Sequence, residues 1–251
     1  MYGNGHNEKI IGEVLREGKN RDAVFLVNKF GNRWGKGDGY AVDGSPAYVK
    51  QAFAASTERL GGLYPDAWIL HRVDKNTPIE ETVKAMDELR QEGKFKYIGL
   101  SECSAATLRR AAKVVKISFV EVELSPWTTT MEASRYKSPE DFANDGDFRG
   151  MLPRMQKDVW AKNYRIVEEF QKLAEKKGCT PGQLSLAWVM AQGDNIIPIP
   201  GTKSEKYLEE NFAARDVELT EEDLKELRQV IDANKPEGGR YPDTFASTLD
   251  E

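Results

Sequence analysis

The stretch Ala67-Trp68-Ile69-Leu70-His71, followed by Thr77-Pro78-Ile79-Glu80, carries the pattern that decides the fold. Four apolar residues in a row predict a buried strand. A threonine before a proline predicts the start of a helix, and Glu80 would complete a capping box with Thr77. The same succession of strand and helix start recurs along the chain. Strands that alternate with helices favour parallel pairing through right-handed crossovers, so the sequence predicts an α/β layer or barrel.

Four more apolar runs predict buried strands, at 23–27, 97–100, 119–122 and 196–199. Capping residues predict further helix starts at Ser45-Pro46, Ser104, Thr180-Pro181, Ser204 and Thr220-Glu221. Gly93 and Gly178 are predicted to end helices. From Ser125 to Asp158 no strand is predicted, and a polar loop of this length is either functional or a sign of a wrong assignment.

Length and composition limit the class of protein. The 251 residues suffice for one α/β barrel domain or for two smaller domains, and because no linker divides the chain we predict a single domain over 1–251. A net charge of -5 argues against a nucleic-acid partner. The longest apolar runs are too short to span a bilayer, and no signal region follows Met1, which predicts no membrane partner and a cytoplasmic location. Cys103 and Cys179 lack metal-ligand spacing, so we predict thiols and no metal site.

Three residues are candidates for catalysis: Tyr2, Lys29 and His71. Lys29 and His71 are expected at the carboxyl ends of the first two strands, which meet at one rim of a parallel barrel. An ammonium lowers the pKa of a neighbouring phenol and makes it a usable proton donor, and an imidazole can orient a carbonyl oxygen. Taken singly, each residue has a plainer interpretation: a disordered terminal tyrosine, a solvated lysine, and a histidine whose hydrogen bonds are satisfied within the fold.

The segment Gly201-Thr202-Lys203-Ser204 is a candidate anion site. It follows a predicted strand and opens a predicted helix, so backbone N–H groups, a hydroxyl and an ammonium would meet at one point. The 2′-phosphate of NADPH would fit such a site. The alternative is an ordinary turn with a surface lysine. No Gly-x-Gly-x-x-Gly sequence follows a strand, which disfavours a Rossmann cofactor site.

The chain resembles the aldo-keto reductases, most closely the fungal and plant branch of pyridoxal-reductase-like and perakine-reductase-like enzymes. The matching stretches are Tyr2-Gly3-Asn4-Gly5-His6-Asn7-Glu8, Val27-Asn28-Lys29-Phe30-Gly31, Leu70-His71-Arg72-Val73-Asp74, Gly99-Leu100-Ser101-Glu102 and Pro200-Gly201-Thr202-Lys203-Ser204 with Glu210-Asn211. The resemblance implies a (β/α)8 TIM barrel and NADPH-dependent reduction of a small carbonyl substrate. Tyr2 would donate the proton, Lys29 would lower its pKa, and His71 would orient the carbonyl.

The resemblance also assigns the cofactor residues. Ser101, Glu102 and Glu121 fall where the family contacts the nicotinamide, Gly201, Thr202, Lys203 and Ser204 where it binds the phosphate, and Glu210 and Asn211 where it holds the adenine end. Trp34 and the following loop either line the substrate pocket or form a solvated connection.

Several features depart from the family pattern. The family's catalytic aspartate belongs to an Asp-Thr-Ala sequence before the tyrosine, and no residue precedes Met1 here. A strand ending in Tyr-Ser-Pro-Leu-Gly is missing, which predicts a deletion junction near 131–136. Glu121 replaces a common glutamine and Leu124 a common tyrosine. Five strands instead of eight predict an incomplete barrel with exposed sheet edges. A second hypothesis is therefore an impaired or inactive homologue that acts as an NADPH-binding or regulatory protein.

Overall fold

The computed structural model describes residues 2–35, 39–126, 138–140, 148–242 and 250, with the side chains of Tyr2, Trp34, Phe148 and Arg149 outside that description. The chain divides into two compact units, Met1–Val122 with Ser247–Glu251, and Glu123–Ala246. That the two act as the single domain predicted for 1–251 stays a prediction, and the predicted junction near 131–136 lies outside the described residues.

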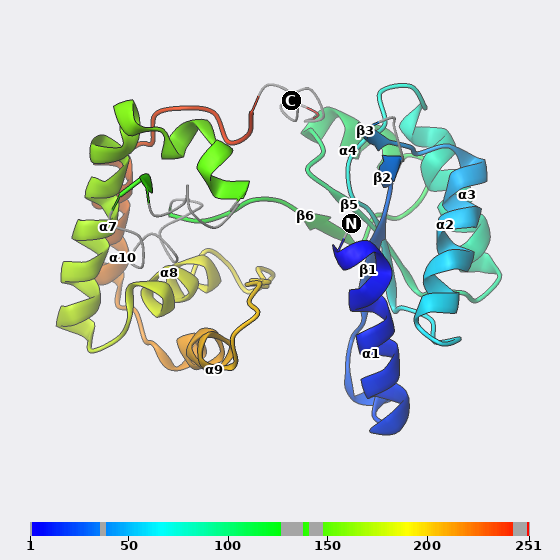
Figure 1. Cartoon of the computed structure of the whole chain (residues 1–251), viewed down its shortest axis with the longest axis horizontal. Coiled ribbons are helices and arrows are strands. Elements are labelled where there is room, and N and C mark those ends of the chain that lie inside the picture. The colour runs from blue at the N-terminus through cyan, green and yellow to red at the C-terminus, as the bar shows by residue number, and fades with distance from the viewer. Residues whose placement is uncertain (1, 36–38, 127–137, 141–147, 243–249, 251) are drawn as a thin grey trace. The chain divides into compact units, whose positions relative to one another are not determined.

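The first unit is built on a four-stranded parallel sheet (Figure 1). Its strands are β1 (Val27–Phe30), β4 (Ala67–Leu70), β5 (Tyr97–Ser101) and β6 (Phe119–Glu121), in the order β1-β4-β5-β6. The predicted strands at 67–70, 97–100 and 119–122 are confirmed to within a residue. The sheet is the part of the described chain that carries the (β/α) alternation expected from the sequence.

The first strand begins later than predicted. Residues Arg21–Ala23 form a short 3-10 helix, η2, and Val24 and Phe25 are 41% and 52% exposed. The Leu26 N–H donates to Asp66 Oδ2 at 2.9 Å instead of to a neighbouring strand. Pairing starts only at Val27, so Val27 is the one residue of the predicted strand 23–27 that belongs to β1.

Four helices accompany this sheet: α1 (His6–Glu17), α2 (Pro46–Arg59), α3 (Ile79–Gln91) and α4 (Ala105–Ala112). Ser45 and Ser104 cap α2 and α4 through their side chains, as predicted. The capping box predicted at Thr77 is wrong. Helix α3 begins at Ile79 without a side-chain cap, because the Thr77 hydroxyl donates to Asp74 Oδ2 at 2.8 Å.

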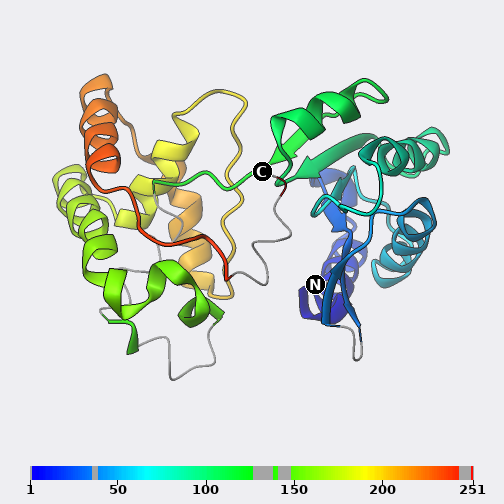
Figure 2. The ribbon, with the colours of Figure 1, turned by 90° about the horizontal axis from the view of Figure 1, so that it is seen from above.

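The core of the first unit lies between the sheet and the neighbouring helices α2 and α3 (Figure 2). Phe30 stacks on Trp68 with ring centroids 5.0 Å apart, and Phe53 of α2 meets Trp68 edge-on at 5.3 Å. Val49 and Val83 are fully buried between these layers. Burial of apolar surface stabilises the fold by about 25 cal/mol per Å². This packing therefore holds the sheet, and with it the polar residues at its edge, in place.

An antiparallel hairpin, β2 (Asn32–Gly35) and β3 (Gly39–Val42), occupies the segment that the sequence left as a loop. The Asp74 carboxylate holds the chain just after β3, because its Oδ2 accepts a hydrogen bond from the Gly44 N–H at 2.9 Å. Asp74 is 7% exposed and also accepts from the Asn76 N–H through Oδ1. This buried aspartate therefore ties the hairpin to the loop after β4.

In the described part of the second unit, all regular secondary structure is helical. It contains η3 (Phe148–Met151), η4 (Pro153–Met155), α7 (Lys157–Lys177), α8 (Pro181–Met190), α9 (Glu205–Ala213), η5 (Ala214–Asp216) and α10 (Glu221–Ala233). Thr180 and Thr220 form capping boxes at the starts of α8 and α10, and Gly178 ends α7 with a φ of 68°. The described part of the long segment predicted as loop is thus two 3-10 turns and the start of α7.

The strand predicted at 196–199 is wrong. These residues form neither helix nor strand, and Ile197 and Ile199 are 75% and 65% exposed. Pro198 and Pro200 have no N–H to donate to a sheet, and proline is confined to the edges and first residues of strands.

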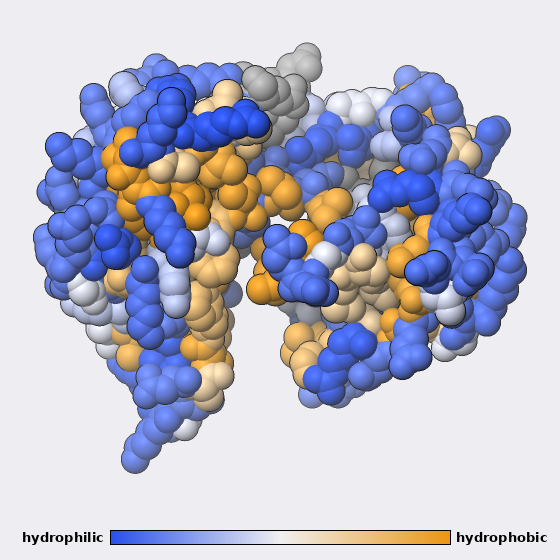
Figure 3. Space-filling view, turned by 180° about the vertical axis from the view of Figure 1, so that it is seen from behind, coloured by the Kyte–Doolittle hydropathy of each residue, from blue (hydrophilic) through white to orange (hydrophobic). Residues whose placement is uncertain are grey.

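Apolar residues reach the surface of both units among a largely hydrophilic exterior (Figure 3). No helix in the described ranges is long and apolar enough to cross a membrane.

Candidate active site

Four predicted site residues lie on one face of the sheet at its carboxyl edge. Side chains alternate between the two faces of a strand, and residues paired across parallel strands share a face. Lys29 pairs with Ile69 two residues before His71, and Ser101 pairs with Glu121. The His71 N–H donates to the Phe30 carbonyl at 2.7 Å and extends the ladder by one residue. The fold therefore brings Lys29, His71, Ser101 and Glu121 together.

The Lys29 ammonium is ion-paired with the Glu121 carboxylate across the sheet. The two side chains are 15% and 24% exposed, so water screens the pair only in part. Glu121 was predicted as a contact for the nicotinamide, and in the structure its carboxylate holds the lysine. The pairing fixes where the ammonium lies, but it also offsets part of its positive charge.

His71 is held in its neutral form. Burial is the main cause, and the positive charges of Lys29 and Arg72 add to it, which together lower the pKa of His71 to about 3. A neutral imidazole has one N–H that can donate to a carbonyl oxygen. The chemistry of His71 at neutral pH is therefore hydrogen bonding to a substrate and not donation of a proton from an imidazolium.

Tyr2 lies in a tight turn. Its backbone belongs to η1 (Tyr2–Gly5), which leads directly into α1. Gly3, Asn4 and Gly5 all have positive φ, at 60°, 51° and 89°. Glycine adopts this region freely, whereas asparagine is one of the few other residues that tolerate it. Asn4 of this turn and Lys29 of β1 line the same cavity, while the phenol of Tyr2 lies outside the described side chains.

Two of the predicted nicotinamide contacts lie at the end of β5, where Ser101 is the last residue of the strand and Glu102 follows it. Ser101 is 2% exposed, and its hydroxyl has no hydrogen-bond partner in the part of the chain that the structure describes. Glu102 has a φ of 50°, and its N–H donates to the Glu121 carbonyl at 2.8 Å. This bond closes the sheet edge beside the ion pair of Glu121.

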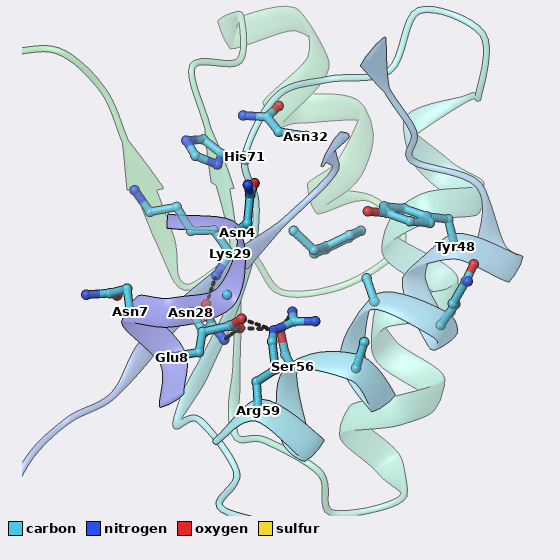
Figure 4. Close-up of a pocket in the computed structure, with 15 residues that line it drawn as sticks. Asn4, Asn7, Glu8, Asn28, Lys29, Asn32, Tyr48, Ser56, Arg59 and His71 are labelled. Atoms are coloured by element: carbon cyan, nitrogen blue, oxygen red, sulfur yellow. Dashed lines mark hydrogen bonds and ion pairs between the residues drawn. The ribbon is translucent and has the colours of Figure 1, made fainter. Parts of the chain in front are cut away.

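Lys29 and His71 line a cavity of about 390 Å³ in the first unit (Figure 4). Its walls come from η1, α1, β1, α2 and the start of β2 and are mainly polar; they include Asn4, Asn7, Glu8, Asn28, Asn32, Tyr48, Gln51, Ser56 and Arg59. A cavity of this size lies in the range of small-molecule sites. No group of three metal-ligating side chains occurs in the ranges described.

The remaining cofactor candidates belong to the second unit. Gly201, Thr202 and Lys203 are exposed, and the Ser204 N–H donates to Thr202 Oγ1 at 3.1 Å in the turn before α9. Ser204 precedes α9 without a side-chain cap, so no hydroxyl occupies the N–H groups of the first turn. Lys203 forms no ion pair with any described residue.

Glu210 and Asn211 lie on α9, and Glu210 already has partners. Its carboxylate accepts from Thr180 Oγ1 at 2.7 Å, and its carbonyl accepts from Gln183 Nε2 at 3.2 Å. Glu210 thus joins α9 to the start of α8. Trp34 lies in β2, and its side chain is outside the described ones, so its predicted place in the substrate pocket stays a prediction.

The sequence interpretation missed a second polar cluster behind Lys29. Glu8 accepts hydrogen bonds from Asn28 Nδ2 at 2.8 Å and Ser56 Oγ at 2.5 Å, and it is ion-paired with Arg59. Glu8 and Asn28 do belong to stretches that matched the family. Ser56 and Arg59 gave no local signal, because their contact with Glu8 spans about fifty residues of chain.

Comparison with known protein families assigns this fold and site to a class of protein. The model of the aldo/keto reductase family matches residues 1–143 and 130–232. The chain belongs to the aldo/keto reductase family, and the resemblance inferred from the sequence is confirmed. The two overlapping ranges meet in the segment where the sequence departs from the family pattern.

Curated relatives match almost the whole chain. An aldo-keto reductase yakc [NADP(+)] of Schizosaccharomyces pombe is 41% identical over 278 residues, which cover 99% of this chain and 82% of the relative. An aldo-keto reductase of Gibberella moniliformis is 41% identical and is covered to 80%. The first alignment is longer than the 251 residues of this chain, so the relative has residues without a counterpart here.

Solved structures share the fold. A glycerol dehydrogenase from Gluconobacter oxydans superposes with a TM-score of 0.77 over 95% of this chain and 80% of its own, at 22% identity. A thermostable aldo-keto reductase in complex with epalrestat gives a TM-score of 0.65 over 91% of this chain and 79% of its own, at 24% identity. The fold is therefore of the aldo-keto reductase (β/α)8 type, with four parallel strands in the described ranges.

Proposed function

We propose that this chain reduces an aldehyde or ketone to an alcohol with NADPH as the hydride donor. Family membership and the NADP(+) specificity in the name of the Schizosaccharomyces pombe relative support the reaction class and the cofactor. The observation that carries the proposal is the placement of Lys29 and His71 on one face of adjacent parallel strands, at the edge of a cavity. We also propose a cytoplasmic location, as predicted from the sequence.

The residues divide the work of the reaction. His71, neutral because its pKa is about 3, donates an N–H to the substrate carbonyl and orients it. Tyr2 donates the proton to the developing alkoxide, and the Lys29 ammonium makes the phenol a stronger acid. NADPH, when bound, supplies the hydride. Proton donation of this kind is worth roughly 100- to 10,000-fold in rate.

Each unit, taken by itself, offers groups that we propose for one part of NADPH. The unpaired hydroxyl of the buried Ser101 suits a carboxamide, with Glu102 and Glu121 beside it. The uncapped first turn of α9 and the free ammonium of Lys203 suit a phosphate, together with Gly201, Thr202 and Ser204. Glu210 and Asn211 are proposed for the adenine end, and Trp34 for the substrate pocket.

One observation favours a second candidate function. The Glu121 carboxylate already neutralises the Lys29 ammonium, and a neutralised lysine activates a phenol less. A chain with that pairing would bind NADPH through the residues above and turn over slowly or not at all. It would then act as an NADPH-binding or regulatory protein.

Binding and turnover measured on the same preparation separate the two candidates. NADPH binding is followed by nicotinamide fluorescence, and turnover by loss of absorbance with an aromatic aldehyde. Binding with turnover supports the reductase, and binding without turnover supports the regulatory protein. Absence of both contradicts both.

The proposal that Lys203 binds the 2′-phosphate of NADPH can be tested separately. Lys203→Ala should weaken NADPH binding by about tenfold and leave NADH binding unchanged, because only NADPH carries the 2′-phosphate. Equal weakening of both cofactors would contradict the assignment.

A further inference from the structure

Glu8 connects three elements of the first unit (Figure 4). It lies in the first turn of α1, its Oε1 accepts from Asn28 of β1 and from Ser56 of α2, and its Oε2 is ion-paired with Arg59 at the end of α2. Each partner comes from a segment far away in the sequence. One carboxylate therefore fixes the start of α1 against both the first strand and the neighbouring helix.

The contact with Asn28 links Glu8 to β1, the strand that carries Lys29. Asn28 immediately precedes Lys29, and successive side chains on a strand point to opposite faces. The Asn28 amide group donates to Glu8 through Nδ2, and its Oδ1 accepts from the Lys29 backbone N–H at 2.8 Å. By holding Asn28 on the helix side of β1, Glu8 sets how Lys29 leaves the strand on the other face.

The contact with Arg59 reaches the turn that carries Tyr2. A Cβ atom added at Gly5 would overlap Cδ of Arg59 and lie 2.8 Å from its Nε, so the arginine packs directly against this turn. Gly5 has a φ of 89° and starts α1 without a side-chain cap. The Arg59 side chain thus packs against this turn at Gly5 and is itself held by Glu8.

Glu8 carries a charge at neutral pH. Burial alone would raise its pKa, but the hydrogen bonds from Arg59, Asn28 and Ser56 and the charge of Arg59 outweigh it, so the pKa of Glu8 lies below its ordinary value. Its side chain is 15% exposed and that of Arg59 is 34% exposed. A partly buried carboxylate with three donors keeps a fixed position, because the loss of any donor leaves its charge poorly compensated.

We propose that Glu8 is a positioning residue for the reaction, which holds the turn of Tyr2 against the strand of Lys29. The inference rests on the proposed function. Loss of Glu8 should misplace the proton donor relative to the lysine and leave the cofactor residues untouched. A misplacement of about 1 Å can cost about 100-fold in rate. The effect should therefore appear in kcat and not in the affinity for NADPH.

The test compares Glu8→Ala and Glu8→Gln with Glu13→Gln, which changes an exposed glutamate of the same helix. For Glu8→Ala we expect kcat to fall roughly 10- to 100-fold, with KM and the Kd for NADPH within about twofold of wild type. The alkaline limb of the kcat profile should move to higher pH, because a phenol farther from the ammonium is a weaker acid. Glu8→Gln keeps an acceptor for Asn28 and Ser56 and should recover part of kcat.

The outcomes distinguish the two proposals. An active wild type whose kcat and pH profile are unchanged in folded Glu8→Ala overturns the positioning role alone. A wild type that oxidises no NADPH overturns the proposed function. If Glu8→Ala does not fold, Glu8→Gln and Arg59→Lys test the positioning role in its place. Each variant should lower kcat and shift the pH profile of kcat, while its circular dichroism spectrum stays that of the wild type. Unchanged kinetics in both variants would overturn the positioning role.

Discussion

The Lys29 ammonium forms an ion pair with the Glu121 carboxylate, from the first strand of the parallel sheet to the last. The pair places a negative charge beside the lysine that we propose to activate Tyr2. If Tyr2 is the proton donor as proposed, the charge on Glu121 should affect the acidity of its phenol.

Replacing Glu121 by glutamine should make the proton donor more acidic. Glu121→Gln removes the negative charge beside Lys29, so the ammonium acts on Tyr2 at full strength and lowers the pKa of the phenol. We expect the alkaline limb of kcat/KM to move by about one pH unit toward lower pH. Glu80→Gln, in the exposed ion pair with Arg110, is the matched control. An unchanged profile in Glu121→Gln would show that the pair does not act on the donor.

His71 should make stability depend on pH below neutrality. Its pKa is about 3 in the folded chain and ordinarily 6.5, so the unfolded chain takes up the proton first as the pH falls. The stabilisation is complete above about pH 6.5 and is lost progressively toward pH 3. Between pH 7 and pH 5 the free energy of unfolding should fall by up to about 2 kcal/mol. Urea titrations of wild type and His71→Gln measure it, and an equal pH dependence in both would contradict the low pKa.

The same low pKa predicts the pH profile of the reaction. Since His71 stays neutral between about pH 5 and pH 9, kcat should show no titration near pH 6.5. A limb at that pH that disappears in His71→Gln would show that the imidazole titrates during catalysis and would contradict the proposed hydrogen-bonding role.

Gly12 should be needed for the close approach of α1 to the end of α2. A Cβ added at Gly12 would lie 2.5 Å from the Leu60 carbonyl oxygen and 2.8 Å from its Cα, and backbone atoms cannot move aside as a flexible side chain does. Gly12→Ala should destabilise the chain by about 1–3 kcal/mol and lower kcat, since α1 also carries Glu8. The control is Gly18→Ala, where the nearest atoms belong to the Asn20 side chain. Equal stability of Gly12→Ala and wild type would contradict this packing.

Local patterns predicted the elements whose structure depends on near neighbours. The strand at 67–70 is buried on both faces, so its residues are apolar without a break, and Ser45, Ser104, Thr180 and Thr220 cap helices through contacts three residues away. The apolar run at 196–199 failed as a predictor because its prolines cannot join a ladder. The first strand was misplaced because Asn28 and Lys29, which form it, are polar residues of the site.

The sequence predicted several residues of the candidate site but not the contacts between them. Lys29, His71, Ser101 and Glu121 follow from the ends of strands and from the family pattern. The ion pair of Lys29 with Glu121 joins residues 92 positions apart, and no spacing in the sequence indicates it. The same holds for Glu8 with Arg59, 51 positions apart. Such contacts depend on which strands and helices become neighbours.

The central claim is tested most directly by kcat for an aromatic aldehyde at saturating NADPH, in wild type and in Tyr2→Phe. The variant keeps the ring and removes only the hydroxyl. A reductase with Tyr2 as its proton donor predicts a measurable kcat for the wild type and a loss of roughly 100- to 10,000-fold in the variant, with NADPH binding unchanged. A Tyr2→Phe variant that turns over as fast as the wild type would contradict the account.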